Sequence, residues 1–206
     1  RAHLLRVGVI GFAPPQISEW DRNHLDGLVH TRDILAAARA WLPRLRARGA
    51  DIIVALAHTG IGGIDPEDGS ENAATALASL PEIDAVVAGH SHMVFPGPGF
   101  APSPHVDPVA GRLAGKPAVM PGHSASHVGI IDLRLARCST GPRRWQVAGA
   151  KVRIGPRGAG SETTPALQHA LAPDHRATLA WSRRQLGETA VPLHSQFATT
   201  TPSAAL

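Results

Sequence analysis

Three histidines in this chain stand where they could bind a metal ion together. The segment Gly89-His90-Ser91-His92 ends one apolar run, and His58 ends an earlier one. Two imidazoles at positions i and i+2 of a turn can point into one crevice, and imidazole is a good ligand for Zn, Mn, Fe or Ni. An isolated His-x-His segment is more often a pair of exposed loop side chains. The case for a metal site therefore depends on where the chain places His58.

The apolar runs before these histidines predict two neighbouring strands. Residues 51–57 and 84–88 show no amphipathic alternation, which is typical of buried strands. A helix is predicted over 32–48, with Thr31 as N-cap and Gly49 after its last turn. A short helix is predicted over 72–80. This alternation predicts a largely parallel sheet with right-handed crossovers.

The predicted sheet brings the three histidines to one edge. The carboxyl ends of adjacent parallel strands meet there, and open α/β sheets bind their ligands at this edge. Gly89 is expected to allow the sharp turn after the second strand. We therefore expect His58, His90 and His92 to reach one crevice, where three imidazoles suit a metal ion.

The rest of the chain is predicted to form further strands, two loops and one helix. A first strand is predicted over 4–12, followed by a polar loop over 16–30. Residues 118–120 and 128–135 are predicted as strands, and 145–154 as an antiparallel neighbour of the latter. Residues 95–110 are predicted as a loop, and 165–181 as a helix.

Other catalytic patterns are weaker. The sequence contains no Gly-x-Ser-x-Gly segment and no P-loop, and no glutamate lies in helical register with the histidines, so a zinc peptidase is not supported. His123 and His127 could line the same crevice, although a loop histidine that merely packs near a site is the default interpretation. Five further histidines are expected to be solvated: His24, His30, His105, His169 and His194.

Composition excludes several classes of protein. Of 206 residues, 43% are hydrophobic and 17% charged, which is typical of a globular chain. The one cysteine, Cys138, excludes an internal disulfide and a cysteine-based zinc cluster. No apolar run approaches the ~20 residues needed to span a membrane, and no signal-peptide pattern is seen.

Charge is unevenly distributed. Residues 1–133 carry 10 basic and 13 acidic groups, whereas residues 134–206 carry 10 basic and 3 acidic groups. A basic segment can bind nucleic acid. These arginines are scattered among Pro, Gly and Ser without interleaved aromatics, which favours an ordinary solvated surface, so a nucleic-acid-binding module is the weaker hypothesis.

The histidine segments resemble motifs of a known superfamily. Gly89-His90-Ser91-His92 resembles the Gly-His-x-His signature of calcineurin-like metallophosphoesterases, and Ala57-His58-Thr59-Gly60 resembles their upstream single-histidine motif. The chain is similar to the bacterial 2′,3′-cyclic-nucleotide 2′-phosphodiesterase/3′-nucleotidases of the 5′-nucleotidase family. This likeness extends over about residues 5–197 and rests on Val9 to Ile17 with Trp20-Asp21, Gly49 to Val54, Gly89 to Gly97, Pro117 to Gly122, and His127 to Leu133.

The resemblance implies a fold and a metal centre. Residues 1–154 would form the C-terminal part of a four-layer α/β/β/α metallophosphoesterase domain. Residues 155–164 would be a linker, and 165–206 an interdomain helix with the start of a C-terminal domain. Two divalent metal ions (Mn, Zn, Co or Fe) are implied. His58 and His90 would ligate one and His92 the other, and the metals would activate a water that attacks the phosphorus of a nucleotide.

The resemblance also implies residues that this sequence lacks. The family's Asp-x-His, Gly-Asp and Gly-Asn-His motifs do not occur, so no catalytic histidine is assigned, and the chain is expected to be a fragment that begins after them. The implied whole protein is a periplasmic hydrolase with a nucleotide substrate, and neither a nucleic-acid polymer nor a membrane is expected as a partner. The alternative is a catalytically inactive remnant that binds metal.

Overall fold

The chain is divided into two compact units. The computed structural model describes residues 4–141, 143–158 and 164–190. Contacts separate residues 1–158 from 159–206, a division within the stretch 155–164 that was predicted as a linker. In the second unit, helix α5 (Pro165–Ser182) matches the predicted helix. Residues 191–206, part of the predicted start of a further domain, lie outside the described residues. None of the described helices is long and apolar enough to cross a membrane.

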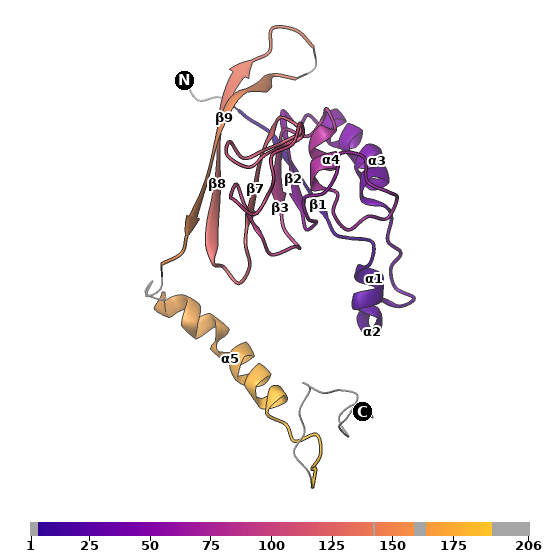
Figure 1. The fold of residues 1–206 in the computed structure, drawn as a ribbon, viewed down its shortest axis with the longest axis vertical. Coiled ribbons are helices and arrows are strands. Elements are labelled where there is room, and N and C mark those ends of the chain that lie inside the picture. Colours follow the sequence, from indigo (N-terminus) through magenta and orange to yellow (C-terminus); the bar gives the residue numbers. More distant parts are fainter. Residues whose placement is uncertain (1–3, 142, 159–163, 191–206) are drawn as a thin grey trace. The chain divides into compact units, whose positions relative to one another are not determined.

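The first unit is built on a parallel sheet, as predicted. Four parallel strands lie in the order β1 (Val7–Phe12), β2 (Ile52–Ala57), β3 (Ala85–Ala88) and β7 (Lys116–Pro121) (Figure 1). Each of these strands pairs with its neighbour in parallel. Three two-residue antiparallel strands extend this sheet: β4 (Val94–Phe95), β5 (Val106–Asp107) and β6 (Arg112–Leu113).

Two helices cover one face of the parallel sheet. Helix α3 (Ile34–Ala47) buries Ala38 and Leu42, and the short helix α4 (Ala74–Ser79) buries Leu77 against the same core. The predicted N-cap of α3, Thr31, is wrong. The cap is Asp33, whose carboxylate accepts a hydrogen bond from the Ala36 N–H at 2.8 Å.

Gly49 follows α3 with a left-handed backbone (φ +86°), as the sequence predicted. The predicted loop over 16–30 is wrong in part. It contains two single-turn helices, α1 (Ile17–Trp20) and α2 (Arg22–Leu25). Four-residue helices are too short to produce an apolar periodicity in the sequence.

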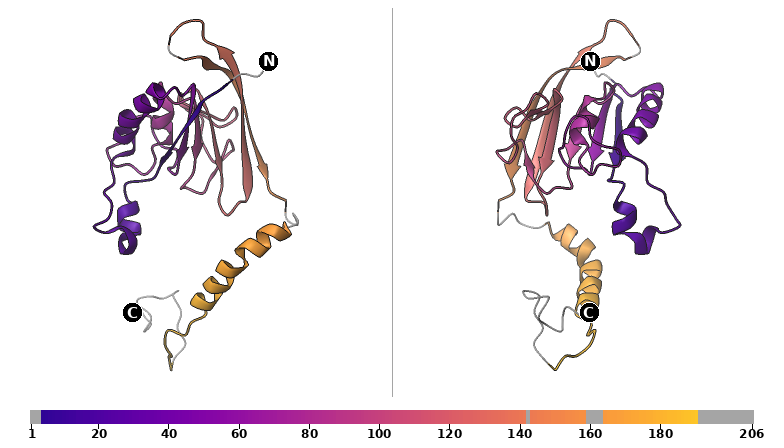
Figure 2. Two further views of the ribbon diagram at one scale, coloured as in Figure 1. Left: turned by 180° about the vertical axis from the view of Figure 1, so that it is seen from behind. Right: turned by 45° about the vertical axis from the view of Figure 1, so that its right-hand side comes forward.

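A long antiparallel hairpin covers the other face of the sheet. Strands β8 (His127–Arg137) and β9 (Trp145–Pro156) pair along their length, as predicted (Figure 2). Gly129 allows close contact here, because a Cβ at this position would lie 3.1 Å from the Val119 side chain. The described residues of this unit thus form three layers, which are helices, parallel sheet and hairpin.

Strand β1 is an edge of the sheet with an apolar surface. Among the described residues, no strand pairs with its outer side. Val7 and Val9 are 50% and 53% exposed, and Leu56 on the neighbouring strand is 46% exposed. Parallel sheets are ordinarily covered on both faces, so this exposed apolar area is unusual for such a sheet.

Buried ion pairs join the amino ends of the strands to their surroundings. Asp84 accepts hydrogen bonds from the guanidinium of Arg46 at 2.7 Å and from the Ile53 N–H at 2.8 Å. Asp51 accepts from the guanidinium of Arg144 at 2.7 Å. This hydrogen bond holds the pKa of Asp51 below its ordinary value of 3.8. The network ties the end of α3 and the start of β9 to the sheet.

Candidate metal centre

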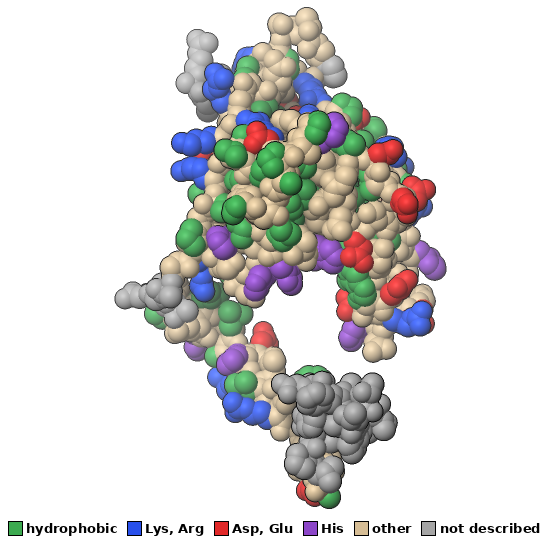
Figure 3. Space-filling view, in the orientation of Figure 1, with side chains coloured by type: hydrophobic (Ala, Val, Ile, Leu, Met, Phe, Trp, Pro, Cys, Tyr) green, Lys and Arg blue, Asp and Glu red, His purple; other side chains and the backbone are tan. Residues whose placement is uncertain are grey.

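The predicted histidines lie at the carboxyl edge of the parallel sheet. Ala57 of β2 pairs with Ala88 of β3, so His58 and the Gly89–His92 turn leave the sheet at the same level. The His58 N–H donates to the Phe12 carbonyl at 2.9 Å and joins this edge to β1. In Figure 3, histidine side chains gather along the lower edge of this unit. The predicted placement of these histidines at one edge is confirmed.

The turn after β3 has its left-handed residues at the histidines themselves. His90 has φ +69° and His92 has φ +60°. Gly89, which was expected to provide the unusual backbone, does not have a positive φ, and a Cβ there would make only an ordinary contact at 3.5 Å with the His58 ring. The prediction for Gly89 is therefore wrong. Positive φ at non-glycine residues costs roughly 1–2 kcal/mol each and is found preferentially at functional sites.

The imidazoles form two pairs. The ring centres of His58 and His90 are 5.5 Å apart, and those of His92 and His123 are 5.1 Å apart. Two imidazoles that share a zinc ion, with Zn–N bonds of about 2.0–2.1 Å, have ring centres roughly 5 Å apart. Each pair therefore fits as part of the donor set of a divalent ion.

Neither pair amounts to a complete metal site. Among the described residues, no group of three or more His, Cys, Asp or Glu side chains is arranged to hold an ion by itself. The assignment of His58, His90 and His92 as metal ligands stays a prediction.

His90 makes two further contacts that the sequence did not predict. Its Nε2 atom lies 3.1 Å from Oε2 of Glu71, and its ring stacks on the ring of Trp20 with centres 5.2 Å apart and planes 17° apart. Glu71 and Trp20 come from two different segments, before α4 and at the end of α1. Trp20 belongs to a segment on which the family resemblance rests, whereas no sequence pattern pointed to Glu71.

The position of Glu71 is fixed by the end of β2. The hydroxyl of Thr59, which is fully buried, donates to the Glu71 carbonyl and accepts from the Ala73 N–H at 2.8 Å. The Ala74 N–H donates to the Gly60 carbonyl at 3.1 Å. A Cβ on Gly62 would lie 2.2 Å from the carbonyl oxygen of Asn72, so this close approach of two backbones requires glycine.

The loop before Glu71 is held at a second point. The Asp33 carboxylate accepts from the Gly69 N–H at 3.0 Å, and the Gln16 side-chain amide donates to the Gly69 carbonyl at 2.7 Å. Burial raises the pKa of Asp33, but the hydrogen bonds from the Ala36 and Gly69 N–H groups outweigh it and lower the pKa below 3.8. The ionised Asp33 thus fixes the loop to the start of α3.

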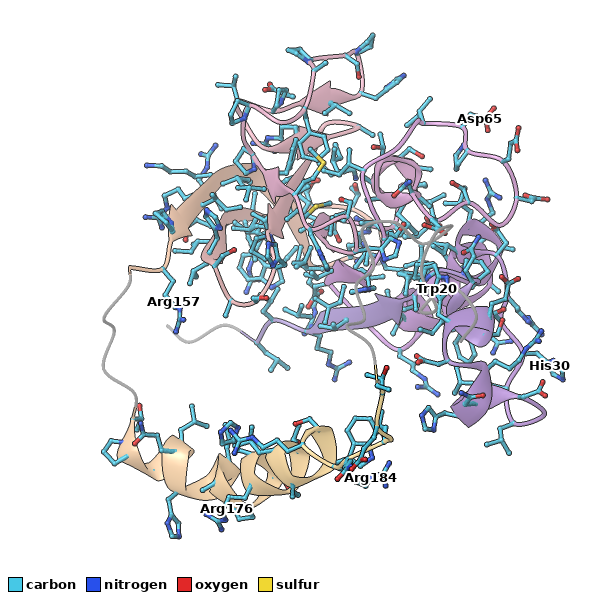
Figure 4. All side chains as sticks on the ribbon, turned by 60° about the horizontal axis from the view of Figure 1, so that its bottom comes forward. Trp20, His30, Asp65, Arg157, Arg176 and Arg184 are labelled. Carbon is cyan, nitrogen blue, oxygen red and sulfur yellow. The ribbon has the colours of Figure 1, made fainter. Side chains whose placement is uncertain are left out.

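Six further histidines were considered in the sequence analysis, and they divide into three groups. The His127 ring lies 2.9 Å from the Ser126 hydroxyl rather than against another imidazole. Four are exposed, as expected: His24, His30, His105 and His169. His30 projects from the periphery of its unit in Figure 4. His194 lies outside the described residues.

Comparison with known proteins connects this edge of the sheet to phosphate-ester chemistry. No family model matches the chain. A protein of Haemophilus influenzae named 2′,3′-cyclic-nucleotide 2′-phosphodiesterase/3′-nucleotidase is 38% identical over 204 residues, which is 96% of this chain and 31% of that protein. A protein of the same name from Salmonella typhimurium is 38% identical and is matched by 94% of this chain. The chain is homologous to these nucleotide phosphoesterases.

Solved structures of phosphoesterases share this fold. The crystal structure of the calcineurin-like phosphoesterase YfkN from Bacillus subtilis matches with a TM-score of 0.77 and 36% identity, over 87% of this chain and 54% of that one. A putative 5′-nucleotidase from Staphylococcus aureus shows the same fold with a TM-score of 0.52 at 22% identity. The homologues are named as phosphoesterases, which are hydrolases of ester bonds. The chain spans about 30% of the length of the two cyclic-nucleotide phosphodiesterases.

Proposed function

We propose that this chain forms part of a two-metal phosphoesterase that hydrolyses nucleotides of the 2′,3′-cyclic and 3′ type. The observation that carries the proposal is the arrangement of four imidazoles as two pairs at the carboxyl edge of the parallel sheet. Homologues named for this activity support the substrate class. A periplasmic location is part of the same proposal.

The residues of this chain have distinct tasks in the proposed reaction. His58 and His90 supply neutral imidazole nitrogens to one divalent ion, and His92, beside His123, faces the second. Two ions bound here supply positive charge that stabilises the phosphate oxygens and lowers the pKa of a water. The strand ends hold the imidazoles in place, and the exposed side chains of His58 and His92 leave this edge accessible to a phosphate ester. Groups that complete the two ligand sets come from outside the two pairs.

A metal titration tests the assignment of ligands. Calorimetry of the 206-residue chain with Mn²⁺, Co²⁺ or Zn²⁺ is expected to show binding that weakens at least about tenfold in His58→Ala and in His90→Ala. His30→Ala is the matched control, because this histidine is exposed at the periphery of the unit, and its variant is expected to bind as the parent does. Equal binding by all three variants would contradict the proposed ligands.

Turnover separates the enzyme from its alternative. Hydrolysis of bis(p-nitrophenyl) phosphate by the metal-loaded chain, lost in His90→Ala, would support catalysis by these residues. Metal binding that depends on His90 without any hydrolysis supports the alternative, a metal-binding remnant. Hydrolysis that survives His90→Ala would refute the role of this edge.

A further inference from the structure

The His90 ring is held by side chains from three segments. Glu71 lies 3.1 Å from Nε2, Trp20 stacks on one face, and His58 meets the ring at an angle of 63°. The side chain of His90 is 20% exposed, so part of it is accessible to solvent. These contacts engage Nε2 and the ring face, and they leave Nδ1 as the nitrogen outside the described contacts.

We propose that Glu71 is a positioning residue that fixes the proton of His90 on Nε2 and presents Nδ1 to the metal. A neutral imidazole carries one N–H, so an Nε2–H that donates to the Glu71 carboxylate leaves the Nδ1 lone pair available. Histidines that ligate metals almost always donate their other N–H to a carboxylate, carbonyl or water, which also fixes the ring orientation. The metal in this inference rests on the proposed function, whereas the hydrogen bond between Glu71 and His90 does not depend on it.

The carboxylate is well placed for this task because its backbone is immobilised. Thr59, one residue after His58, bonds to the backbone on both sides of Asn72 through a buried hydroxyl. The same strand end therefore carries one proposed ligand and orients the other. Trp20 adds a flat apolar surface that limits rotation of the ring about its Cβ–Cγ bond.

The tautomer of His90 gives a direct test. Long-range ¹H–¹⁵N spectra of the full chain, with His90 assigned by the loss of its signals in His90→Gln, report which ring nitrogen carries the proton. In the metal-free chain, we expect the neutral ring to be protonated on Nε2, and Glu71→Ala to convert it to a mixture of tautomers. With Zn²⁺, the Nδ1 shift is expected to move. A proton on Nδ1 in the parent chain, or a tautomer insensitive to Glu71→Ala, would overturn the proposal.

Metal affinity separates positioning from direct ligation. Glu71→Ala is expected to weaken Zn²⁺ binding about 10- to 100-fold, and Glu71→Gln to weaken it less because the amide oxygen still accepts from Nε2–H. Glu67→Ala is the matched control, since this carboxylate lies in the same loop and is exposed. If Glu71→Gln abolished binding as completely as Glu71→Ala, Glu71 would be a ligand instead.

The two hypotheses can fail independently. A chain that binds no Zn²⁺ but shows the Glu71-dependent Nε2 tautomer would refute the proposed metal function and retain the hydrogen bond. A chain that binds Zn²⁺ through His90 Nε2 would retain the metal function and refute the role of Glu71.

Discussion

The two ends of the parallel sheet use polar side chains in opposite ways. At the amino end, Asp51 and Asp84 are 2% and 6% exposed and bond to arginines and backbone N–H groups. At the carboxyl end, His58 and His92 are exposed, and His90 and His92 themselves have left-handed backbone angles. Groups whose bonding capacity is used within the fold stabilise it, whereas groups that keep a lone pair available can bind a ligand. The amino ends of the strands therefore carry satisfied polar groups, and the carboxyl ends carry the exposed imidazoles of the proposed metal centre.

The largest effect on stability is expected for Asp84→Ala. Removal of the carboxylate leaves Arg46, 15% exposed, without its buried partner, and loss of one member of a buried pair costs about 3–5 kcal/mol. We expect the free energy of unfolding, measured by urea denaturation, to fall by about 3 kcal/mol.

An exposed ion pair in the same unit provides the control for Asp84→Ala. Asp132 and Arg153 form a pair of 2.7 Å with side chains 56% and 52% exposed. Such pairs contribute about 0–1 kcal/mol, so Asp132→Ala is expected to change stability little. If both variants lost the same stability, the amino end would not be the stabilising end.

At the carboxyl end, a glycine substitution is expected to be more stable than the alanine substitution at the same position. His90→Gly and His90→Ala remove the same ring contacts, but only glycine adopts φ +69° without strain. We expect His90→Gly to unfold with a free energy about 1 kcal/mol higher than that of His90→Ala in urea titrations.

A comparison of glycine with alanine at a helical position gives the reference for this prediction. At Ala36, in the first turn of α3, glycine is expected to lower stability by about 1 kcal/mol relative to alanine. A His90→Gly variant no more stable than His90→Ala would show that the turn stores no backbone strain.

The smallest expected effect is on the pH dependence of the free energy of unfolding. The pKa of Asp51 is below 3.8 in the folded chain because Arg144 donates to it, so the native state binds fewer protons than the unfolded state near that pH. Its contribution is present above about pH 4 and is lost as the pH falls through the lower folded pKa.

Asp51→Asn is therefore expected to flatten the decline of stability measured between about pH 5 and pH 2. An unchanged slope in Asp51→Asn would place the acid sensitivity elsewhere.

The sequence predicted the sheet and the edge that carries the histidines. Residues 51–57 and 84–88 are apolar runs that end at His58 and at Gly89-His90, and hydrophobic patterning of this kind reports burial directly. The parallel pairing of β2 with β3 and the antiparallel pairing of β8 with β9 followed from the same patterning.

Contacts between distant loops were not predictable in this way. Glu71 meets His90 across 19 residues, and Arg144 meets Asp51 across 93 residues. Neither contact has a periodicity, because each depends on how loops close over the finished sheet. The N-cap at Asp33, in contrast, was within reach of the sequence, because its capping hydrogen bond from Ala36 spans three residues and Asp is at least as good an N-cap residue as Thr.

The exposed edge at β1 has a consequence for the behaviour of the chain in solution. An unpaired strand flanked by half-exposed Val7, Val9 and Leu56 offers both backbone hydrogen bonds and apolar area to any similar surface. Natural sheets protect such edges with charge, proline or a covering segment. This side of the sheet, where no described strand covers β1, therefore favours pairing with another apolar strand edge or face.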